Sequence, residues 1–231
     1  MSAYTVTTQA EFDAAWAAHQ DDRCAEILID SPRGVWIEVR AYGSATVTAY
    51  DSATVTASGS ATVTAYGSAT VRAYGSATVT ASSYVAVHLH SARVTVSGGV
   101  ILDVTKLDLT DVNTWADYTG ATITDGHVTL YKAVDANLVT GHSYIRTTWA
   151  IGDDVTCTDW KDTHTYGYGL HASPHPHQAL HYNRGATRML EVTVPVADLR
   201  TIPGSVAKAK ARTMRVVREV NLDGSPIEVT R

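Results

Sequence analysis

The sequence predicts a mainly β protein, in which a β-solenoid is followed by a small α+β domain. Two observations carry this prediction: an eight-residue repeat that runs without insertion from Tyr42 to Ala81, and a change to longer alternating segments after His127. A fixed short period is typical of stacked repeat architectures. We expect four segments, in chain order: a capping helix in residues 1–24, the solenoid in 25–109, a connector in 110–126 and the α+β domain in 127–231.

The first segment is predicted to close one end of the solenoid. Thr8 and Glu11 have the spacing of a capping box, and apolar residues follow at helical intervals, so we expect a helix over about residues 9–19. An uncovered solenoid end exposes unpaired strand edges. We expect this helix, with Trp16, to cover that end, and the larger side chains of residues 99–109 to close the other.

Each octad is predicted to form one short strand and one bend. The repeat Tyr-Gly-Ser-Ala-Thr-Val-Thr-Ala alternates Ala and Val with Ser and Thr, and Val and Thr favour strands. The Gly-Ser or Asp-Ser pairs are typical of turns. Because the apolar side chains are only Ala and Val, the interior of the stack is expected to be narrow.

The number of octads in one coil is predicted from the first octad position. That position is occupied in turn by Tyr, Tyr, Ser, Tyr, Tyr and Ser between residues 42 and 82. The pattern repeats every third octad and indicates a three-sided, right-handed β-helix of about 24 residues per coil. The alternative is a flattened, two-sided coil of two octads, or about 16 residues.

The last segment has the pattern of an α+β domain. Alternating apolar residues predict strands at 127–134, 188–196 and 210–220. A hairpin that turns at Gly152 and Asp153 is expected within residues 143–157. A short helix is expected to run from Ser173 to about Tyr182, with the serine as its N-cap and a proline in its first turn.

Charge, cysteine content and the N-terminal residues indicate where the protein is located and which classes of partner are not expected. A formal net charge of −5 gives no general argument for nucleic acid or for an anionic membrane surface. The N-terminal residues lack a basic segment followed by an apolar run, and no stretch approaches the length of a membrane span. Two cysteines, Cys24 and Cys157, are too few for a disulfide framework. We expect a cytoplasmic protein that is not secreted by a signal peptide and has no membrane partner.

The outward octad positions form the first candidate binding surface. Stacked strands would order their hydroxyl groups into arrays, and stacked tyrosines would add exposed aromatic area. The expected contact residues are Thr46, Thr48, Thr54, Thr56, Thr62, Thr64, Thr78, Thr80, Tyr50, Tyr66 and Tyr74, with Arg72 interrupting one row. Such a surface favours a non-enzymatic scaffold that binds a protein partner or a second copy of itself, or alternatively a glycan.

Two clusters of titratable residues are further candidates. Zinc or nickel would need three or four of the histidines His171, His175, His177 and His181 to converge, but no known ligand spacing is matched, so neither metal nor cofactor is expected. Lys208, Lys210 and Arg212 alternate on one strand. They could contact phosphates, but lysines on an exposed edge strand more often prevent that strand from pairing with another chain. Nucleic acid is therefore not the expected partner.

Three resemblances add to these expectations. The Tyr-Gly-Ser octad looks like half of an ice-nucleation repeat, which implies an ice-binding threonine array as a second alternative function. The octads in residues 37–60, together with the segments LYKAVDA, GLHASPHPHQALHY, LEVTVP and KARTMRVVREV, resemble uncharacterised proteins of actinobacteria and their phages. That resemblance implies a phage accessory protein, located in the host cell or associated with the virion.

The third resemblance implies an enzyme. LYKAV followed by GYGLHASPHPHQALHY is similar in layout to ADP-ribosyltransferases of the His-Tyr-Glu type, in which a histidine and a tyrosine hold NAD. Lys132 stands where that histidine would be, His171 stands where the tyrosine would be, and Glu191 or Glu219 would be the glutamate. The alternative function is therefore an enzyme in the C-terminal domain, with Lys132, Tyr144, His171 and Glu191 as its site.

Overall fold

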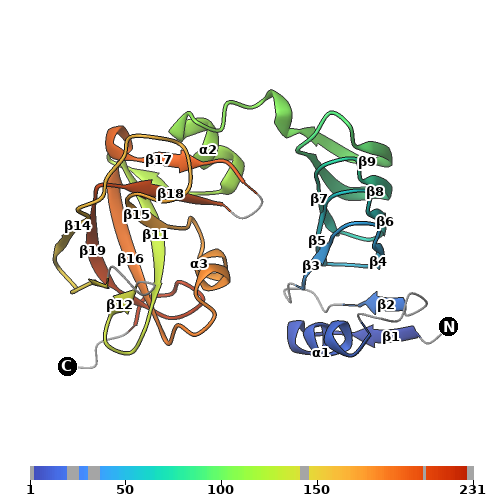
Figure 1. Cartoon of the computed structure of the whole chain (residues 1–231), viewed down its shortest axis with the longest axis horizontal. Helices are drawn as coiled ribbons and strands as arrows, with labels where there is room; N and C mark the ends of the chain where they lie inside the picture. Colours follow the sequence, from blue (N-terminus) through green and yellow to red (C-terminus); the bar gives the residue numbers. More distant parts are fainter. Residues whose placement is uncertain (1–2, 20–25, 31–36, 141–145, 205–206, 228–231) are drawn as a thin grey trace. The chain divides into compact units, whose positions relative to one another are not determined.

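Strands dominate the computed structural model, which confirms the mainly β class (Figure 1). It describes residues 3–19, 26–30, 37–140, 146–204 and 207–227. The chain divides into two compact units, Met1–Leu107 and Asp108–Arg231. None of the helices in the described ranges is long and apolar enough to cross a membrane.

A helix and two strands form the N-terminal end of the first unit. These elements are β1 (Ala3–Val6), α1 (Gln9–His19) and β2 (Glu26–Ile29), and β1 pairs with β2 in parallel. The capping box is confirmed, because Glu11 N donates to Thr8 Oγ1 at 3.3 Å and Thr8 N donates to a Glu11 carboxylate oxygen at 3.3 Å. Phe12 is the helix residue buried in the solenoid core, whereas Trp16 is 36% exposed and stacks on Phe12.

One side chain of α1 closes a strand edge. The Gln9 amide donates from Nε2 to Glu38 O at 3.2 Å, and its Oε1 accepts from Glu38 N at 2.7 Å. The amide therefore satisfies both backbone groups of the first residue of β3, as a neighbouring strand would. This contact supports the predicted role of the helix as a cap.

The octads form two stacks of short parallel strands. The elements are β3 (Glu38–Ala41), β4 (Thr46–Ala49), β5 (Thr54–Ala57), β6 (Thr62–Ala65), β7 (Thr70–Ala73), β8 (Thr78–Leu89) and β9 (Thr95–Asp103). One stack runs β2–β4–β6–β8 and the other runs β3–β5–β7–β8, with β9 added on β8. Figure 1 shows β3, β5 and β7 above one another in one column and β4, β6 and β8 in the other.

The pairing register gives the length of the coil. Thr46 pairs with Thr62 and Thr54 pairs with Thr70, so each octad pairs with the second octad after it. The predicted coil of three octads is therefore wrong, and the coil length of the two-octad alternative is confirmed. The misleading Tyr-Tyr-Ser pattern lies at the corners, where side chains such as Tyr42 and Tyr66 lie outside the core and are exposed. The right-handed sense stays a prediction.

The interior and the corners follow the octad chemistry. Inward Ala and Val residues from Val39 to Val87 are almost fully buried and form one narrow core. At the corners, serine hydroxyls bond to the coil before: Ser60 Oγ donates to Gly43 O at 3.1 Å, and Ser76 Oγ donates to Gly59 O at 3.0 Å. The Ser of the repeat therefore links successive coils as well as favouring a turn.

The last coil departs from the repeat. β8 and β9 pair in two segments, and residues 82–85 lie between these segments in β8, whereas Gly99 alone lies between them in β9. The corner of β9 is therefore shorter than that of β8. The apolar residues Val100, Ile101 and Leu102 are between 40% and 62% exposed. The expectation that the large side chains of this segment close the solenoid end is therefore wrong for these three residues.

The described residues of the second unit form three sheets and two α-helices. A five-stranded antiparallel sheet has the order β10 (Ile123–Thr124), β11 (His127–Val134), β16 (Arg188–Pro195), β19 (Thr213–Val220) and β14 (Asp154–Thr156). A three-stranded sheet has the order β15 (Leu170–Ala172), β18 (Lys208–Ala211) and β17 (Arg200–Ile202). The remaining elements are the hairpin β12 (Val139–Thr140) and β13 (Thr147–Thr148), α2 (Val112–Thr119), α3 (Pro176–Tyr182), and the short 3₁₀ helices η1 (Val104–Lys106, in the first unit) and η2 (Val196–Asp198).

Two backbone hydrogen bonds join the larger sheets. Tyr131 N donates to Ser173 O at 2.7 Å, and Ser173 N donates to Tyr131 O at 3.0 Å, so the chain that leaves β15 pairs with β11. Ser173 is thus not the helix N-cap that we expected. That position belongs to His175, and Pro176 is the first helical residue. The two sheets consequently bring residues of β11, β15 and β18 together.

Three other expectations for this unit are corrected. Residues 110–126 contain α2 and β10 and belong to the second unit rather than to a connector. The turn at Gly152 exists, but β13 pairs with β12 and β14 pairs with β19, so no hairpin forms there. The last predicted strand is two strands that meet at Arg212 and lie in different sheets.

Candidate functional site

Two rows of hydroxyl-bearing residues run along the stack that contains β4, β6, β8 and β9. In register, one row is Thr46, Thr62, Thr78 and Thr95, and the other is Thr48, Thr64, Thr80 and Ser97. They point outward, because residues between them such as Val47 and Val63 are buried. Paired strands lie about 4.8 Å apart, and alternate residues of a strand about 6.6 Å apart. These eight residues, which we call the hydroxyl face, therefore form a regular grid.

The other stack presents a charged face. Its outward rows are Glu38, Thr54, Thr70 and Ala86, and Arg40, Thr56, Arg72 and His88. Burial, with a smaller contribution from the Arg72 charge, lowers the pKa of His88. Thr54 and Thr56 thus lie apart from the six other predicted contact threonines. Arg72 does interrupt one threonine row, since it pairs with Thr56. Because successive octads alternate between the stacks, that row is not part of the hydroxyl face.

The predicted contact tyrosines lie at two different corners. Tyr50 and Tyr66 follow β4 and β6, and their rings stack with centroids 5.1 Å apart. Tyr74 follows β7 and stacks on His90 at 4.2 Å. Burial, together with the charges of His88 and Arg72, lowers the pKa of His90 to about 4. The structure therefore joins Tyr50 and Tyr66 to the border of the hydroxyl face but places Tyr74 elsewhere.

Lys132 and His171, the two residues that mark the enzyme resemblance, do come together. Lys132 on β11 donates from Nζ to His171 O at 2.8 Å, and its ammonium group lies 5.0 Å from the centroid of the Trp149 ring. Burial, with the nearby Lys208 charge, lowers the pKa of Lys132 to about 8. Burial and the adjacent lysines lower the pKa of His171 to about 4, and its Nε2 is buried without a hydrogen-bond partner.

The carboxylates expected beside this pair lie elsewhere. Glu191 pairs in register with Tyr131, whose side chain is on the opposite face of β11 from Lys132, since strand residues alternate. It accepts from the Arg218 guanidinium at 2.8 and 3.0 Å. Glu219 is bound to Arg188. Tyr144 lies outside the described residues. Of the three predicted residues that the structure describes, it thus brings together Lys132 and His171.

The four histidines do not converge. His175 Nε2 lies 2.7 Å from Thr119 O, and its ring stacks on His177 at 5.6 Å. His181 packs edge-on against Tyr182, and His171 is on β15. Among the residues that the structure describes, no group of three or more His, Cys, Asp or Glu side chains is arranged to hold a metal ion.

Sequence reasoning missed the burial of two candidate lysines on β18. Lys208 and Lys210 are 7% and 0% exposed, because β18 is the middle strand between β15 and β17 and both of its faces are covered. Lys208 Nζ lies 3.6 Å from the Tyr166 ring centroid and 4.0 Å from that of Tyr182. Burial lowers its pKa to about 8. The expected exposed strand edge is therefore wrong, and the alternating Lys-Ala pattern gave no signal of the burial.

Comparison with known proteins adds one match. Residues 128–227 match the family model described as a domain of unknown function, DUF7666. No curated protein matches the chain. No solved structure matches it either. The matched DUF7666 region contains Lys132, His171 and Lys208 but none of the octads, so the two units present separate candidate surfaces.

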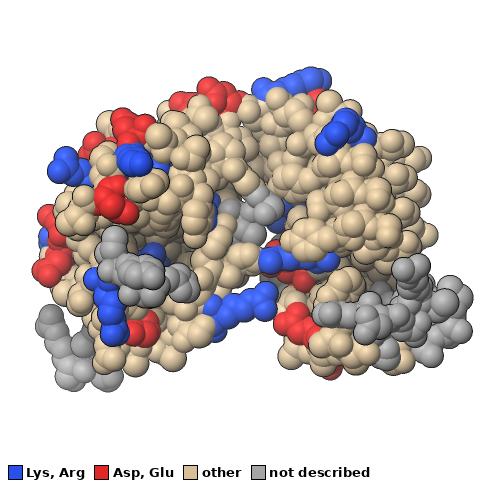
Figure 2. Space-filling view, in the orientation of Figure 1, with Lys and Arg blue, Asp and Glu red and all other residues tan. Residues whose placement is uncertain are grey.

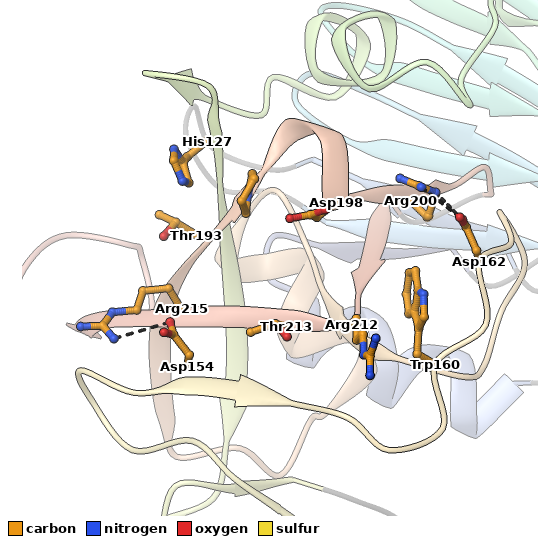
Figure 3. Close-up of a pocket in the computed structure, with 11 residues that line it drawn as sticks. His127, Asp154, Trp160, Asp162, Thr193, Asp198, Arg200, Arg212, Thr213 and Arg215 are labelled. Atoms are coloured by element: carbon orange, nitrogen blue, oxygen red, sulfur yellow. Dashed lines mark hydrogen bonds and ion pairs between the residues drawn. The ribbon is translucent and has the colours of Figure 1, made fainter.

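A groove of about 650 Å³ crosses the outside of the DUF7666 region (Figure 3). His127, Thr193, Thr213 and Arg215 line one part, and Trp160 and Arg212 line another. Figure 3 shows that two of its arginines are neutralised, Arg200 by Asp162 and Arg215 by Asp154. Arg212 is the one predicted candidate residue among the described residues that line this groove, and none of the groups with a pKa near 8 or 4 lines it. The cluster around Lys132 and His171 is therefore the stronger chemical candidate in this unit.

Proposed function

We propose that the chain is a non-catalytic binding and assembly scaffold, and that the hydroxyl face is its contact surface. The observation that carries the proposal is the uninterrupted grid of eight hydroxyl groups over four strands. Stacked coils hold this grid rigid, since each strand is hydrogen-bonded to the next. A preorganised surface loses little conformational entropy when it binds.

The surroundings of the grid favour close approach of a neutral partner. Between Tyr42 and Ser97 the only Asp, Glu, Lys or Arg residues are Asp51, Arg72 and Arg93, and Arg72 is on the opposite face. Figure 2 accordingly shows few charges over most of the solenoid surface in view. Contact with this surface requires little desolvation of charge, which is the costliest part of burying a polar surface.

A second copy of the chain is the partner that the grid fits best. Two identical grids have the same spacing along and across the strands, so the donors and acceptors of one match those of the other about a two-fold axis. Every hydroxyl group is both a donor and an acceptor, which lets the two faces pair without a change of conformation. The stacked rings of Tyr50 and Tyr66 add apolar area at the border.

The test compares the oligomeric state of two matched variants. Thr62→Lys/Thr78→Lys places two like charges on the hydroxyl face, whereas Thr54→Lys/Thr70→Lys places them at the same octad positions on the opposite face. In sedimentation velocity the wild type and the second variant are expected to associate as concentration rises, and the first variant to remain monomeric. A monomeric wild type, or equal loss in both variants, would contradict self-assembly through this face.

Ice binding is a second candidate, and the position of Arg72 supports it. With Arg72 on the opposite face, the two hydroxyl rows continue over four strands, as a flat ice-binding array requires. The same two variants test it: thermal hysteresis should be present in the wild type and Thr54→Lys/Thr70→Lys but absent in Thr62→Lys/Thr78→Lys. The enzyme alternative has less support, because Glu191 faces away from Lys132 and His171.

A further inference from the structure

We infer that Lys132, His171 and Lys208 form a binding site for a small anion that carries a phosphate or carboxylate group. This site lies in the DUF7666 region and is independent of the hydroxyl face. The inference rests on how the three side chains converge, on the absence of a compensating carboxylate in the described structure, and on an unpartnered imidazole nitrogen.

Three strands bring the cluster together. Lys132 comes from β11 and donates to the backbone of His171 on β15. β15 pairs with β18 in a register that places His171 opposite Lys210, so Lys208, two residues before Lys210 in β18, lies on the same face as His171. The Tyr166 ring touches both sides of the cluster, since it lies 5.4 Å from the His171 ring and 3.6 Å from Lys208 Nζ. The backbone pairing therefore fixes these positions.

The positive charge of the cluster lacks a partner within the described ranges. No carboxylate there forms an ion pair with Lys132 or Lys208. Lys210 provides a contrast: it donates to Thr163 Oγ1 and Gly167 O at 2.9 and 3.0 Å, and although burial lowers its pKa, the charges of Asp162 and Asp159 oppose that shift. Two neighbouring buried ammonium groups without an anion are costly, and a bound anion would remove that cost.

The unpartnered nitrogen points to the same ligand class. Buried polar atoms in folded proteins nearly always have a hydrogen-bond partner, and His171 Nε2 has none. An anion bound to the two ammonium groups would favour the protonated imidazole, and Nε2 would then donate to it. The pKa values of Lys132, His171 and Lys208 are all lowered, which is consistent with a site in which the bound ligand supplies the negative charge.

Two exposed tyrosines cover the Lys208 side of the cluster. Tyr166 and Tyr182, whose rings cover Lys208, are 72% and 41% exposed. A small anion can therefore approach the Lys208 ammonium group when either exposed ring rotates about its side-chain bonds, with no change in the strands. The aromatic walls would also accommodate a ring attached to the phosphate, so a nucleoside monophosphate is the organic probe that fits this geometry.

Isothermal titration of the full chain tests the site with three probes: inorganic phosphate, acetate and adenosine monophosphate. Lys132→Met and Lys208→Met each remove one ammonium group, and Lys161→Met is the matched control, because Lys161 lies 3.6 Å from the Tyr168 ring but is exposed. We expect phosphate to bind the two site variants about tenfold or more weakly than the wild type, and the control unchanged. Tighter binding of the nucleotide than of phosphate would identify an organic phosphate as the ligand.

A second measurement needs no substitution. Acetylation of wild-type lysines, followed by mass spectrometry, should be slowed at Lys132 and Lys208 by a saturating probe, and unchanged at Lys161. Failure of all three probes to bind the wild type, or equal binding by all four proteins, would overturn the site. Loss of self-assembly by the hydroxyl-face variant would leave this result unaffected, so the two proposals fail separately.

Discussion

Gly98→Ala is expected to unfold the last coil of the solenoid. Gly98 has a φ of 79°, and a Cβ atom at this position would lie 2.2 Å from Ala81 O. The backbone conformation alone costs an alanine about 1–2 kcal/mol. The Cβ atom would be fixed directly to the backbone of β9, and Ala81 O belongs to the backbone of β8. No side-chain rotation can relieve this contact, so β9 would have to separate from β8. We expect a total loss of about 4 kcal/mol or more in the free energy of unfolding.

Hydrogen exchange of peptides from β8 and β9 measures this loss locally, which is necessary because the chain has two units. Gly43→Ala is the matched control. Gly43 has a φ of 62°, but a Cβ atom there would meet nothing within 4 Å, so only the backbone cost of about 1 kcal/mol is expected. Equal exchange rates in the two variants would show that the close approach to Ala81 does not hold the last coil.

Ala65→Leu is expected to destabilise the solenoid by about 3 kcal/mol. Ala65 is fully buried and lies in register between Ala49 and Ala81. The larger side chain would have to fit between two coils whose spacing is fixed by backbone hydrogen bonds, and overpacking of this kind costs about 1–3 kcal/mol or more.

The midpoint of denaturant unfolding, followed through solenoid peptides, measures this effect. Thr64→Leu is the control, since Thr64 is the adjacent residue and points outward, and a change within about 0.5 kcal/mol is expected there. If Ala65→Leu were tolerated as well as Thr64→Leu, the interior would not be the narrow, tightly packed core described above.

The sequence predicts the strands of the solenoid well but not the size of its coil. Val and Ala alternate with Thr in every octad, and each octad forms the expected strand, because burial selects the inward residues directly. The coil length depends on which octads pair, and identical octads satisfy either pairing. Tyr42, Ser58 and Tyr74 occupy one corner in successive coils, so the Tyr-Tyr-Ser order along the chain does not follow the stacking of the coils.

For the candidate sites, too, the sequence predicts which side chains point outward but not which strands are neighbours. The outward position of the predicted contact threonines follows from alternation, but their division between two faces depends on the coil. The pattern predicts an edge position for Lys208, since nothing in an alternating Lys-Ala segment shows that β18 lies between two other strands. Its contact with Tyr166 and Tyr182 joins residues that are far apart in the chain. Sequence periodicity does not specify such pairs.

The most direct measurement is disulfide formation between pairs of introduced cysteines, in a background with Cys24 and Cys157 replaced by serine. Thr46→Cys/Thr62→Cys joins residues that pair on the hydroxyl face, where the Cα atoms of neighbouring strands lie about 4.8 Å apart and a disulfide is sterically allowed. Thr46→Cys/Thr70→Cys joins equivalent positions three octads apart, on opposite stacks. The first pair is predicted to oxidise readily and the second to stay reduced. The reverse result would establish the three-sided coil and remove the continuous hydroxyl face.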